Sequence, residues 1–491
     1  MAQAKSSGVA INRAKPWQLI LFTMNDVAFN VYFAGINYLS YFATGVVGFS
    51  VVAAANMLTA MRVFDGIIDP PIGVLIDKCN TRFGKFRPFM VGGNLVMAVS
   101  LLLMYYTTSG IPSGIGRILY FLLLYALYII GYSLQSVATR AAQSTLTSDP
   151  KQRPMVSVVS GAGCTVVYAA IQMLVSNYLI VKHGDMNEGF FQDLVLCLIV
   201  GAAVLTVLAV IGIWEKDQPK YYNVGAAAPG GKPKVRLRDY WDIIKGNRGL
   251  QMLILAASTD KLASTVANNS IVGIMVFGII CGNYAVSGQI SAYTAIPTFI
   301  LLILGATYAG RMGQRNAVTV FSALAILFQA LILAMFVFGD PTQIGSNAVV
   351  TTVFIVLFVL RAGCMGVPSS LVIPMIADCA DYELYRTGRF VPGMMGTLFT
   401  FVDQTISAFS NTIVGLLIAT IGYTSVQPSV DDPLTTPIFV MAMFLWCGLP
   451  ILGWICSLIG MKFTPLTKEK MAEVEEKIAV LKAAHADEEN T

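Results

Sequence analysis

Twelve long apolar runs constrain the fold of this chain more than any other feature. Each is long enough to cross a bilayer as a helix, which takes about 20 apolar residues. The runs fall at residues 17–44, 50–77, 88–108, 117–146, 156–181, 190–214, 249–280, 286–309, 316–339, 349–376, 392–422 and 435–462. Only 12% of the residues are charged, roughly half the share that is typical of soluble domains. The sequence therefore predicts an all-α integral membrane protein with twelve transmembrane helices.

A polar segment divides these runs into two groups of six. It contains the turn-rich stretch Ala228-Pro229-Gly230-Gly231-Lys232-Pro233. The C-terminal segment from Lys468 onward has the apolar spacing of an amphipathic helix. We expect an N-terminal tail at 1–16, a six-helix lobe at 17–214, a linker at 215–248, a second six-helix lobe at 249–462 and a C-terminal tail at 463–491.

Basic residues gather in the loops on one side of the predicted membrane. They are Lys78, Arg82, Lys85, Arg87, Lys151, Arg153, Arg311, Arg315, Arg386 and Arg389. The opposite loops hold little beyond Arg117 and Lys182. Cytoplasmic loops carry the excess of lysine and arginine, so we expect both termini and the linker in the cytoplasm. The expected location is the cell membrane, specifically a bacterial inner membrane. The net charge of +5 follows from this topology and gives no reason to expect a nucleic-acid partner.

Cysteine and histidine usage argues against a metal centre or an enzyme. The eight cysteines are spread singly, and the chain has two histidines, His183 and His485, which are far apart. Without a CxxC pair or a His-rich tract, neither a disulfide framework nor a zinc site is expected. A membrane enzyme would need a convergent cluster of such residues near one face. We therefore expect no cofactor, and no metal beyond a possible Na⁺ as coupling ion.

The charged residues inside the predicted spans are the strongest functional signal. Ionisable groups in hydrocarbon are costly, so they mark functional sites by default. The first span contains Asp26, and the second contains Arg62, Asp65 and Asp69. On a helix these last three share one stripe, with the two carboxylates about 6 Å apart along the axis. Carboxylates this close repel unless a cation enters. They predict a coupling-ion site, and the alternative is an ion pair with Arg62 that only locks the helices.

Charges in the other spans leave more than one interpretation open. Arg140 in the fourth span could anchor a substrate carboxylate, or it could pair with an acid of spans one and two. For Asp260 and Lys261, a local pair or a snorkelling lysine is favoured over a binding role. Asp403 lies in the eleventh span, where it or its neighbour could face a transport cavity.

Three stretches together resemble the glycoside–pentoside–hexuronide:cation symporters of the major facilitator superfamily. The first is Arg62-Val-Phe-Asp65-Gly-Ile-Ile-Asp69-Pro70. The second is Asn80-Thr-Arg82-Phe-Gly84-Lys85-Phe-Arg87-Pro88, and the third is Ala377-Asp378-Cys-Ala-Asp381-Tyr382. The spacing fits from the first span to beyond the last. The resemblance implies the major facilitator fold of two six-helix lobes, with a solute site near the midplane between them and transport by alternating access.

The resemblance also implies roles for individual residues. The cation would bind to Asp26, Asp65, Asp69 and Ser133. The cytoplasmic gate would comprise Asp77, Arg82, Lys85, Arg87, Asp378, Asp381 and Arg389. The substrate would contact Asn25, Arg62, Ser136, Arg140, Ser369, Thr400 and Gln404.

The expected substrate site departs from the melibiose carriers of that family. Ser136 and Arg140 stand in place of a sugar-binding aspartate and tryptophan, and Ser369 replaces a tryptophan of the tenth span. Gln404 replaces a lysine of the eleventh span. Arg140 favours an acidic solute. In addition, Ile68 stands where a sodium-using member has an asparagine, which favours H⁺ over Na⁺.

The predicted function is therefore symport of a sugar, glycoside or hexuronide-like solute with H⁺ or Na⁺, by a chain that works as a monomer in the bilayer. A carrier of the same fold for an amphipathic or lipid-like solute is the nearest alternative. A membrane enzyme and a transport-inactive sensor are further alternatives, and the short linker and tail leave no room for a signalling domain.

Overall fold

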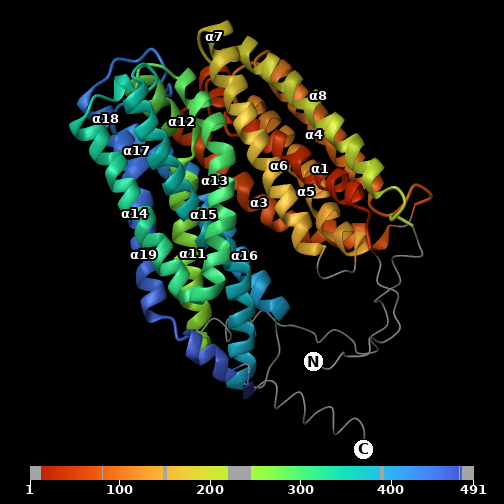
Figure 1. Cartoon of the computed structure of the whole chain (residues 1–491). Helices are drawn as coiled ribbons and strands as arrows, with labels where there is room; N and C mark the ends of the chain where they lie inside the picture. Colours follow the sequence, from red (N-terminus) through yellow and green to blue (C-terminus); the bar gives the residue numbers. More distant parts are fainter. Residues whose placement is uncertain are drawn as a thin grey trace, which may run out of the picture. The chain divides into compact units, whose positions relative to one another are not determined.

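The computed structural model describes residues 13–79, 81–147, 152–218, 245–387, 392–474 and 476–477, and these form helices joined by short loops (Figure 1). In the first half they are α1 (Pro16–Ile36), α2 (Leu39–Tyr41), η1 (Phe42–Val46), α3 (Val51–Lys78), α4 (Arg87–Thr107), α5 (Ile115–Leu146), α6 (Arg153–Leu174), η2 (Val175–Leu179), α7 (Ile180–His183) and α8 (Glu188–Ile213). In the second half they are α11 (Arg248–Ala267), α12 (Ser270–Gly273), η3 (Ile274–Ile280), α13 (Ala285–Met312), α14 (Gln314–Phe338), η4 (Pro341–Gln343), α15 (Ala348–Thr387), α16 (Pro392–Ala408), α17 (Ser410–Thr420), α18 (Thr436–Met443), η5 (Phe444–Gly448) and α19 (Leu449–Phe463).

The predicted all-α membrane architecture is confirmed. Within the described residues, eleven helices are long and apolar enough to cross a membrane, and a twelfth is obtained if one bent pair counts as a single span. That pair joins α11 to the α12–η3 segment at an angle of 52°. The bend has a local cause, because the Asn269 side chain accepts the Ile271 N–H and starts a new helix.

The chain divides into two compact units. The first unit contains Met1–Gly48 and Phe64–Gly231, and the second contains Phe49–Val63 and Lys232–Thr491. The first part of α3 thus groups with the second unit, although the sequence predicted it in the first lobe. Hydrogen bonds explain the grouping. The Thr59 hydroxyl donates to the Ala408 carbonyl at 3.2 Å, and the Val51 N–H donates to the Thr424 carbonyl at 3.0 Å.

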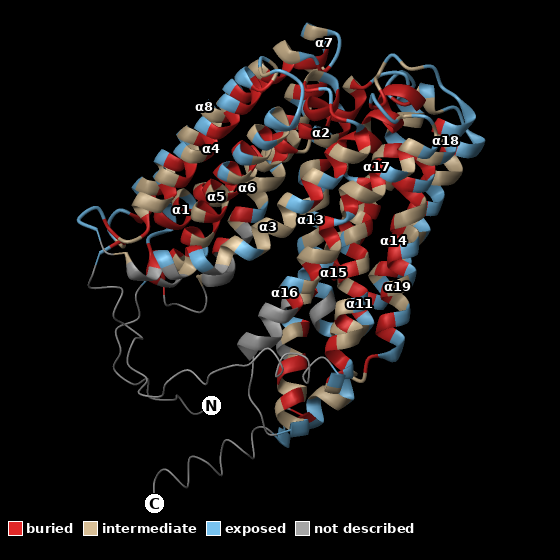
Figure 2. Ribbon diagram, turned by 180° about the vertical axis from the view of Figure 1, so that it is seen from behind, coloured by how far each residue is buried: buried red, intermediate tan, exposed pale blue. Residues whose placement is uncertain are grey.

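In the first unit, α1 is the most enclosed helix and packs against α8, α6 and α5 (Figure 2). Helices α4 and α5 touch through two glycines, Gly93 and Gly131. A methyl group at Gly93 would lie 2.7 Å from the Gly131 carbonyl oxygen, so neither position accepts a side chain without separating the helices. In lipid, the hydrophobic effect does not drive helices together, and small residues instead allow the close packing by which helices associate. This packing fixes α5, which carries several candidate site residues.

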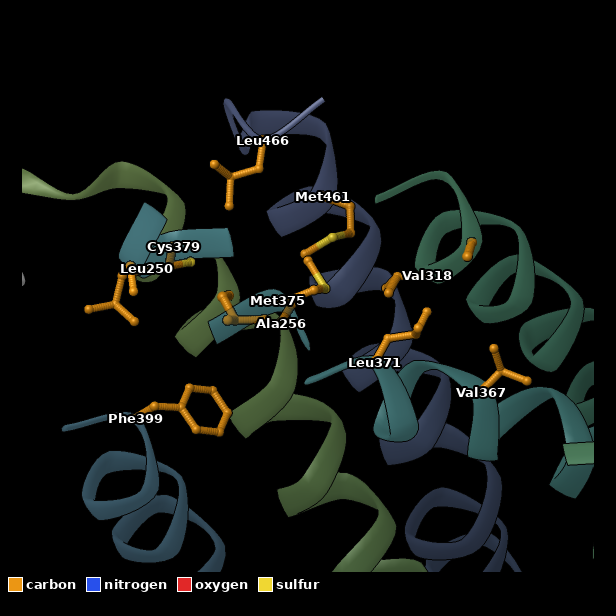
Figure 3. Close-up of a cluster of buried hydrophobic side chains, with 13 residues drawn as sticks. Leu250, Ala256, Val318, Val367, Leu371, Met375, Cys379, Phe399, Met461 and Leu466 are labelled. Atoms are coloured by element: carbon orange, nitrogen blue, oxygen red, sulfur yellow. The ribbon is translucent and has the colours of Figure 1, made fainter. Parts of the chain in front are cut away.

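The second unit has its largest buried hydrophobic cluster where α11, α14, α15, α16 and α19 meet (Figure 3). Its labelled members include Met375 and Cys379 of α15, Phe399 of α16, and Met461 of α19. Leu466, which follows α19, covers the same cluster. The cluster ties the beginning of the C-terminal tail to the membrane helices.

Candidate functional site

Asp65 and Ser133, both predicted to bind the cation, are brought together by α3 and α5. The Ser133 hydroxyl donates to Asp65 Oδ1 at 3.1 Å. Asp65 is half-buried, whereas Ser133 is fully buried. The serine lies on α5 two residues after Gly131, so the close packing of α4 against α5 at Gly131 supports its position.

Asp69 lies one turn further along α3 and faces Arg140 of α5. Its Oδ2 is 3.9 Å from Arg140 Nη1, with 22% of the aspartate side chain and 63% of the arginine side chain exposed. Pairing with an acid of the second span, one of the two roles open to Arg140, is thus observed. The other carboxylate oxygen, Asp69 Oδ1, is buried and has no hydrogen-bond partner among the described residues.

Asp26 of α1 is hydrogen-bonded by a residue that the sequence did not identify. The Ser160 hydroxyl of α6 donates to Asp26 Oδ2. Asn30, one turn later on α1, donates to the Asp26 backbone carbonyl and accepts from Tyr168 of α6. Ser160 stands in a run of small residues, Ser157-Val-Val-Ser160-Gly161-Ala-Gly163, and a polar side chain in such a run is the signal that could have drawn attention to it.

The three carboxylates do not form one ligand cluster. Each has a different partner: Ser160 for Asp26, Ser133 for Asp65 and Arg140 for Asp69. In the part of the chain that is described, no three His, Cys, Asp or Glu side chains are grouped to hold a metal ion. The arrangement suits a carboxylate that takes up a proton, or a monovalent cation held by carboxylate and hydroxyl oxygens together. The assignment of these residues to the cation stays a prediction.

Asn25 and Ser136, expected to contact substrate, are fully buried in the first unit. Asn25 Nδ2 donates to Thr139 Oγ1 at 2.5 Å, and its Oδ1 accepts from Gln135 Nε2 at 2.7 Å. Gln135 also donates to Thr206 Oγ1 of α8 at 3.0 Å. Ser136 donates within its own helix, to the Ser133 carbonyl. Both side chains are buried between helices in this structure, and their assignment to the substrate stays a prediction.

The second unit contains an ion pair between two of the charged residues that the sequence analysis noted. Lys261 of α11 pairs with Asp403 of α16, and the two side chains are 48% and 10% exposed. The sequence had favoured a local pair with Asp260 or a snorkelling lysine. The pairing across helices arises because α11 packs directly on α16. Gln404 is half-buried beside this pair, and Ser369 is exposed on α15.

The second unit also contains Arg62 and Thr400, which were predicted to contact the substrate. The Thr400 side chain lies outside the described residues. Arg62 is half-buried on α3, three residues before Asp65, and it belongs to the second unit.

The expected gate residues of the first unit are organised by Asp217, which follows α8 and is 1% exposed. Asp217 Oδ1 accepts the Lys85 N–H at 2.9 Å, and Oδ2 accepts the Arg87 N–H at 3.1 Å and Arg87 Nε at 3.2 Å. The Arg87 guanidinium also lies 4.3 Å from the centre of the Trp214 ring. Thus Asp217 holds the beginning of α4. An acidic residue directly after a span, opposite a basic loop, was the available sequence signal.

Three other predicted gate residues have described side chains. Arg82 is exposed and lies over the Phe83 ring at 4.9 Å. Asp378 and Asp381 are half-buried on α15. The Asp77 side chain and the whole of Arg389 lie outside the described residues, so their predicted roles stay predictions.

Comparisons with known proteins agree with this fold. The profile of the MFS/sugar transport protein family matches residues 21–468. The glucuronide carrier protein homolog of Escherichia coli strain K12 is 23% identical over 469 residues, covering 94% of this chain and 96% of its own. The inner membrane symporter YicJ of the same strain is 25% identical over 469 residues, covering 93% of each chain.

Solved structures show the same fold at lower sequence identity. The crystal structure of the nucleoside transporter NupG superimposes with a TM-score of 0.59 at 13% identity, covering 92% of this chain and 100% of that one. The predicted major facilitator fold is therefore confirmed. The chain belongs to the MFS/sugar transport protein family, in its glycoside–pentoside–hexuronide:cation symporter branch, and is a secondary transporter of sugars rather than an enzyme.

Proposed function

We propose that the chain is a cation-coupled symporter of an acidic sugar derivative, such as a uronide or a glycoside of an acid, which works by alternating access. The names of its relatives, a glucuronide carrier homolog and an inner membrane symporter, support the solute class and the symport mode. The basic loops support an orientation with both termini in the cytoplasm of a bacterial inner membrane. The coupling ion is H⁺ or Na⁺.

The observation that carries the proposal is the unpartnered oxygen of Asp69. Buried polar atoms are almost always hydrogen-bonded, and an uncompensated buried charge is expensive. Asp69 Oδ1 is buried without a donor among the described residues, while Oδ2 has only a long contact with Arg140. A proton on this carboxyl, or a cation beside it, removes that cost. We therefore assign Asp69 as the residue that changes state during each transport cycle.

Arg140 links this carboxylate to the solute. With Asp69 charged, the guanidinium is attracted to it across 3.9 Å, yet 63% of the arginine side chain stays exposed. When a cation neutralises Asp69, Arg140 is released and can bind a solute carboxylate through paired N–H donors. Solute binding in turn favours the loaded state of Asp69, because binding coupling is reciprocal. Asp65–Ser133 and Asp26–Ser160 would tune the same equilibrium from neighbouring helices.

The test is uptake into proteoliposomes over a panel of uronides and neutral glycosides, with Na⁺ and pH gradients imposed separately. We expect gradient-driven uptake of a uronide that is lost in Arg140→Ala. Because one carboxylate contact through an arginine is worth about 1.5–3 kcal/mol, the apparent affinity should fall about 10- to 100-fold. Arg248→Ala, an exposed arginine at the start of α11, is the matched control.

Two results would refute the proposal. Uptake restricted to neutral sugars, with Arg140→Ala silent, would remove the acidic solute and its anchor. Uptake that needs neither gradient would remove cation coupling altogether.

A further inference from the structure

A cavity lies at one end of the second unit, and one predicted gate residue, Asp378, is part of its wall. Its volume is about 310 Å³. It opens where α13 ends, α14 begins and the chain leaves α19 for the C-terminal tail. The polar and charged side chains that line it are Gln314, Arg315, Asn316, Asp378, Thr467 and Lys468. Because these helices cross the membrane, the cavity is at a membrane boundary.

Two helices begin at the wall of this cavity. The 25-residue helix α14 starts at Gln314, after Gly313 with a φ of 85° and no side-chain cap. A second helix starts at Lys468, where the Thr467 hydroxyl accepts the Lys470 N–H at 3.2 Å. The first N–H groups of a helix have no acceptor within it, and together with the helix dipole they favour negative charge. The start of α14 therefore offers its N–H groups at the cavity wall, whereas amides at the start of the tail helix already have Thr467 and Glu469 as acceptors.

Fixed positive charge is added by two side chains. Arg315 is held in place because its Nε and Nη2 donate to the carbonyls of Met461 and Lys462 at 2.7 and 3.1 Å. Lys468 Nζ donates to the Arg311 carbonyl at 3.4 Å. Asp378 contributes one opposing carboxylate, so the lining keeps a net charge of one positive unit.

The neighbouring Glu469 carboxyl is affected by the same positive charges. The pKa of this exposed carboxyl is lowered first by its own backbone N–H and then by the Thr467 hydroxyl, with Lys468 and Arg315 adding to the effect. This corner of the molecule therefore already stabilises a negative group at the start of the tail helix.

We propose that the cavity binds a phosphate group, supplied by an anionic phospholipid headgroup at the membrane boundary or by free phosphate. The N-terminus of α14, Arg315 and Lys468 would donate to the phosphate oxygens. Basic pockets at the cytoplasmic ends of transmembrane helices bind anionic headgroups in this way. The site shares Asp378 with the predicted cytoplasmic gate and does not depend on the proposed solute.

An occupied site would fasten the tail helix to α14. The first turns of that helix are already attached to α15, because Tyr385 donates to Glu473 at 2.7 Å and accepts from Lys470 at 3.2 Å. Val474 is fully buried and closes the contact. Phosphate binding is therefore expected to stabilise the folded protein.

The test is thermal unfolding of the purified full chain in neutral detergent. Phosphatidylglycerol is compared with phosphatidylcholine, and inorganic phosphate with chloride at equal ionic strength. We expect phosphatidylglycerol to raise the unfolding temperature in a saturable manner. Lys468→Gln should weaken binding about tenfold, as loss of one charge-assisted contact does. Lys462→Gln, which removes the same charge from an exposed residue outside the cavity, should leave binding unchanged.

A second variant keeps the test decisive if Lys468→Gln folds poorly. Asn316→Asp places a carboxylate on the cavity wall and should abolish the response. A saturable response to inorganic phosphate that Lys468→Gln weakens would support the site and assign it to a soluble ligand. The proposal fails if neither phosphate source shifts the unfolding temperature, or if Lys468→Gln and Lys462→Gln respond alike.

Discussion

The two units differ in how the charges of their candidate residues are partnered. In the first unit, Asp69 keeps one buried oxygen without a partner among the described residues, and Arg140 stays largely exposed beside it. In the second unit, Lys261 and Asp403 satisfy each other. Arg361 of α15 is buried there, with its Nη1 donating to Gln329 Oε1 at 3.1 Å and its Cζ 4.4 Å from the Phe358 ring centre, while its Nε has no hydrogen-bond partner among the described residues.

This difference separates charges that can change state from charges that hold structure. A pair that is already neutral gains little from a proton or a cation, whereas an unpartnered carboxylate gains much. We therefore expect the energy of the coupling ion to enter through the first unit. In the second unit, the Lys261–Asp403 pair is expected to stay paired throughout the cycle.

The largest expected effect distinguishes two fully buried glutamines. Gln329→Leu leaves the Arg361 guanidinium without its glutamine acceptor, and losing a buried hydrogen bond to a charged group costs about 1.5–3 kcal/mol. Gln135→Leu should lower the stability by only about 1 kcal/mol. It loses two neutral hydrogen bonds, but it also removes the Gln135 Oε1 acceptor, which is buried without a partner among the described residues. Unfolding by sodium dodecyl sulfate in mixed micelles measures both. If the two variants lose the same free energy of unfolding, the hydrogen bond to Gln329 stabilises Arg361 no more than it would stabilise a neutral group.

A smaller loss of stability is expected at Asp217. Asp217→Asn keeps the shape but weakens the charge-assisted contacts to the Lys85 and Arg87 amides and to Arg87 Nε, at a cost of about 1–3 kcal/mol. Asp340→Asn, in an exposed loop, is the control and should be nearly neutral. The same unfolding assay applies. If Asp217→Asn is as stable as the control, Asp217 does not anchor the start of α4.

The Lys261–Asp403 pair gives a third test, with an effect near 1–2 kcal/mol because the lysine is half exposed. Each single alanine variant should destabilise the fold, and the double variant should recover most of the loss. Uptake should recover with it, since this pair is assigned to structure. A stable double variant that no longer couples uptake to a gradient would move part of the coupling machinery into the second unit.

The two serines should have the smallest effects. Ser133→Ala and Ser160→Ala each remove one hydrogen bond to a carboxylate, which is worth about 0.5–1.5 kcal/mol and predicts a 2- to 10-fold loss of cation affinity. Ser113→Ala, at an exposed serine in the loop before α5, is the control. The measurement is the dependence of uptake on pH or Na⁺ concentration. A silent Ser160→Ala would separate Asp26 from the cation site.

The sequence was informative where a signal lies within one helix. The lengths of the apolar runs predicted the spans, and the spacing of Asp65 and Asp69 predicted carboxylates on one side of α3. Contacts between helices were not accessible in this way. Ser160, Asp217 and the Lys261–Asp403 pair depend on which helices are neighbours, and the burial of Asn25 depends on how α1 is rotated about its axis. Neither packing partner nor rotation is fixed by hydropathy.

Asp69→Asn in proteoliposomes tests the central claim most directly. Gradient-driven accumulation of solute is measured beside exchange of labelled for unlabelled solute without any gradient, which requires binding and conformational change but no net coupling. We predict that Asp69→Asn loses accumulation and retains exchange, because the amide mimics a permanently loaded carboxyl. Accumulation that survives in Asp69→Asn at the wild-type level would contradict the account.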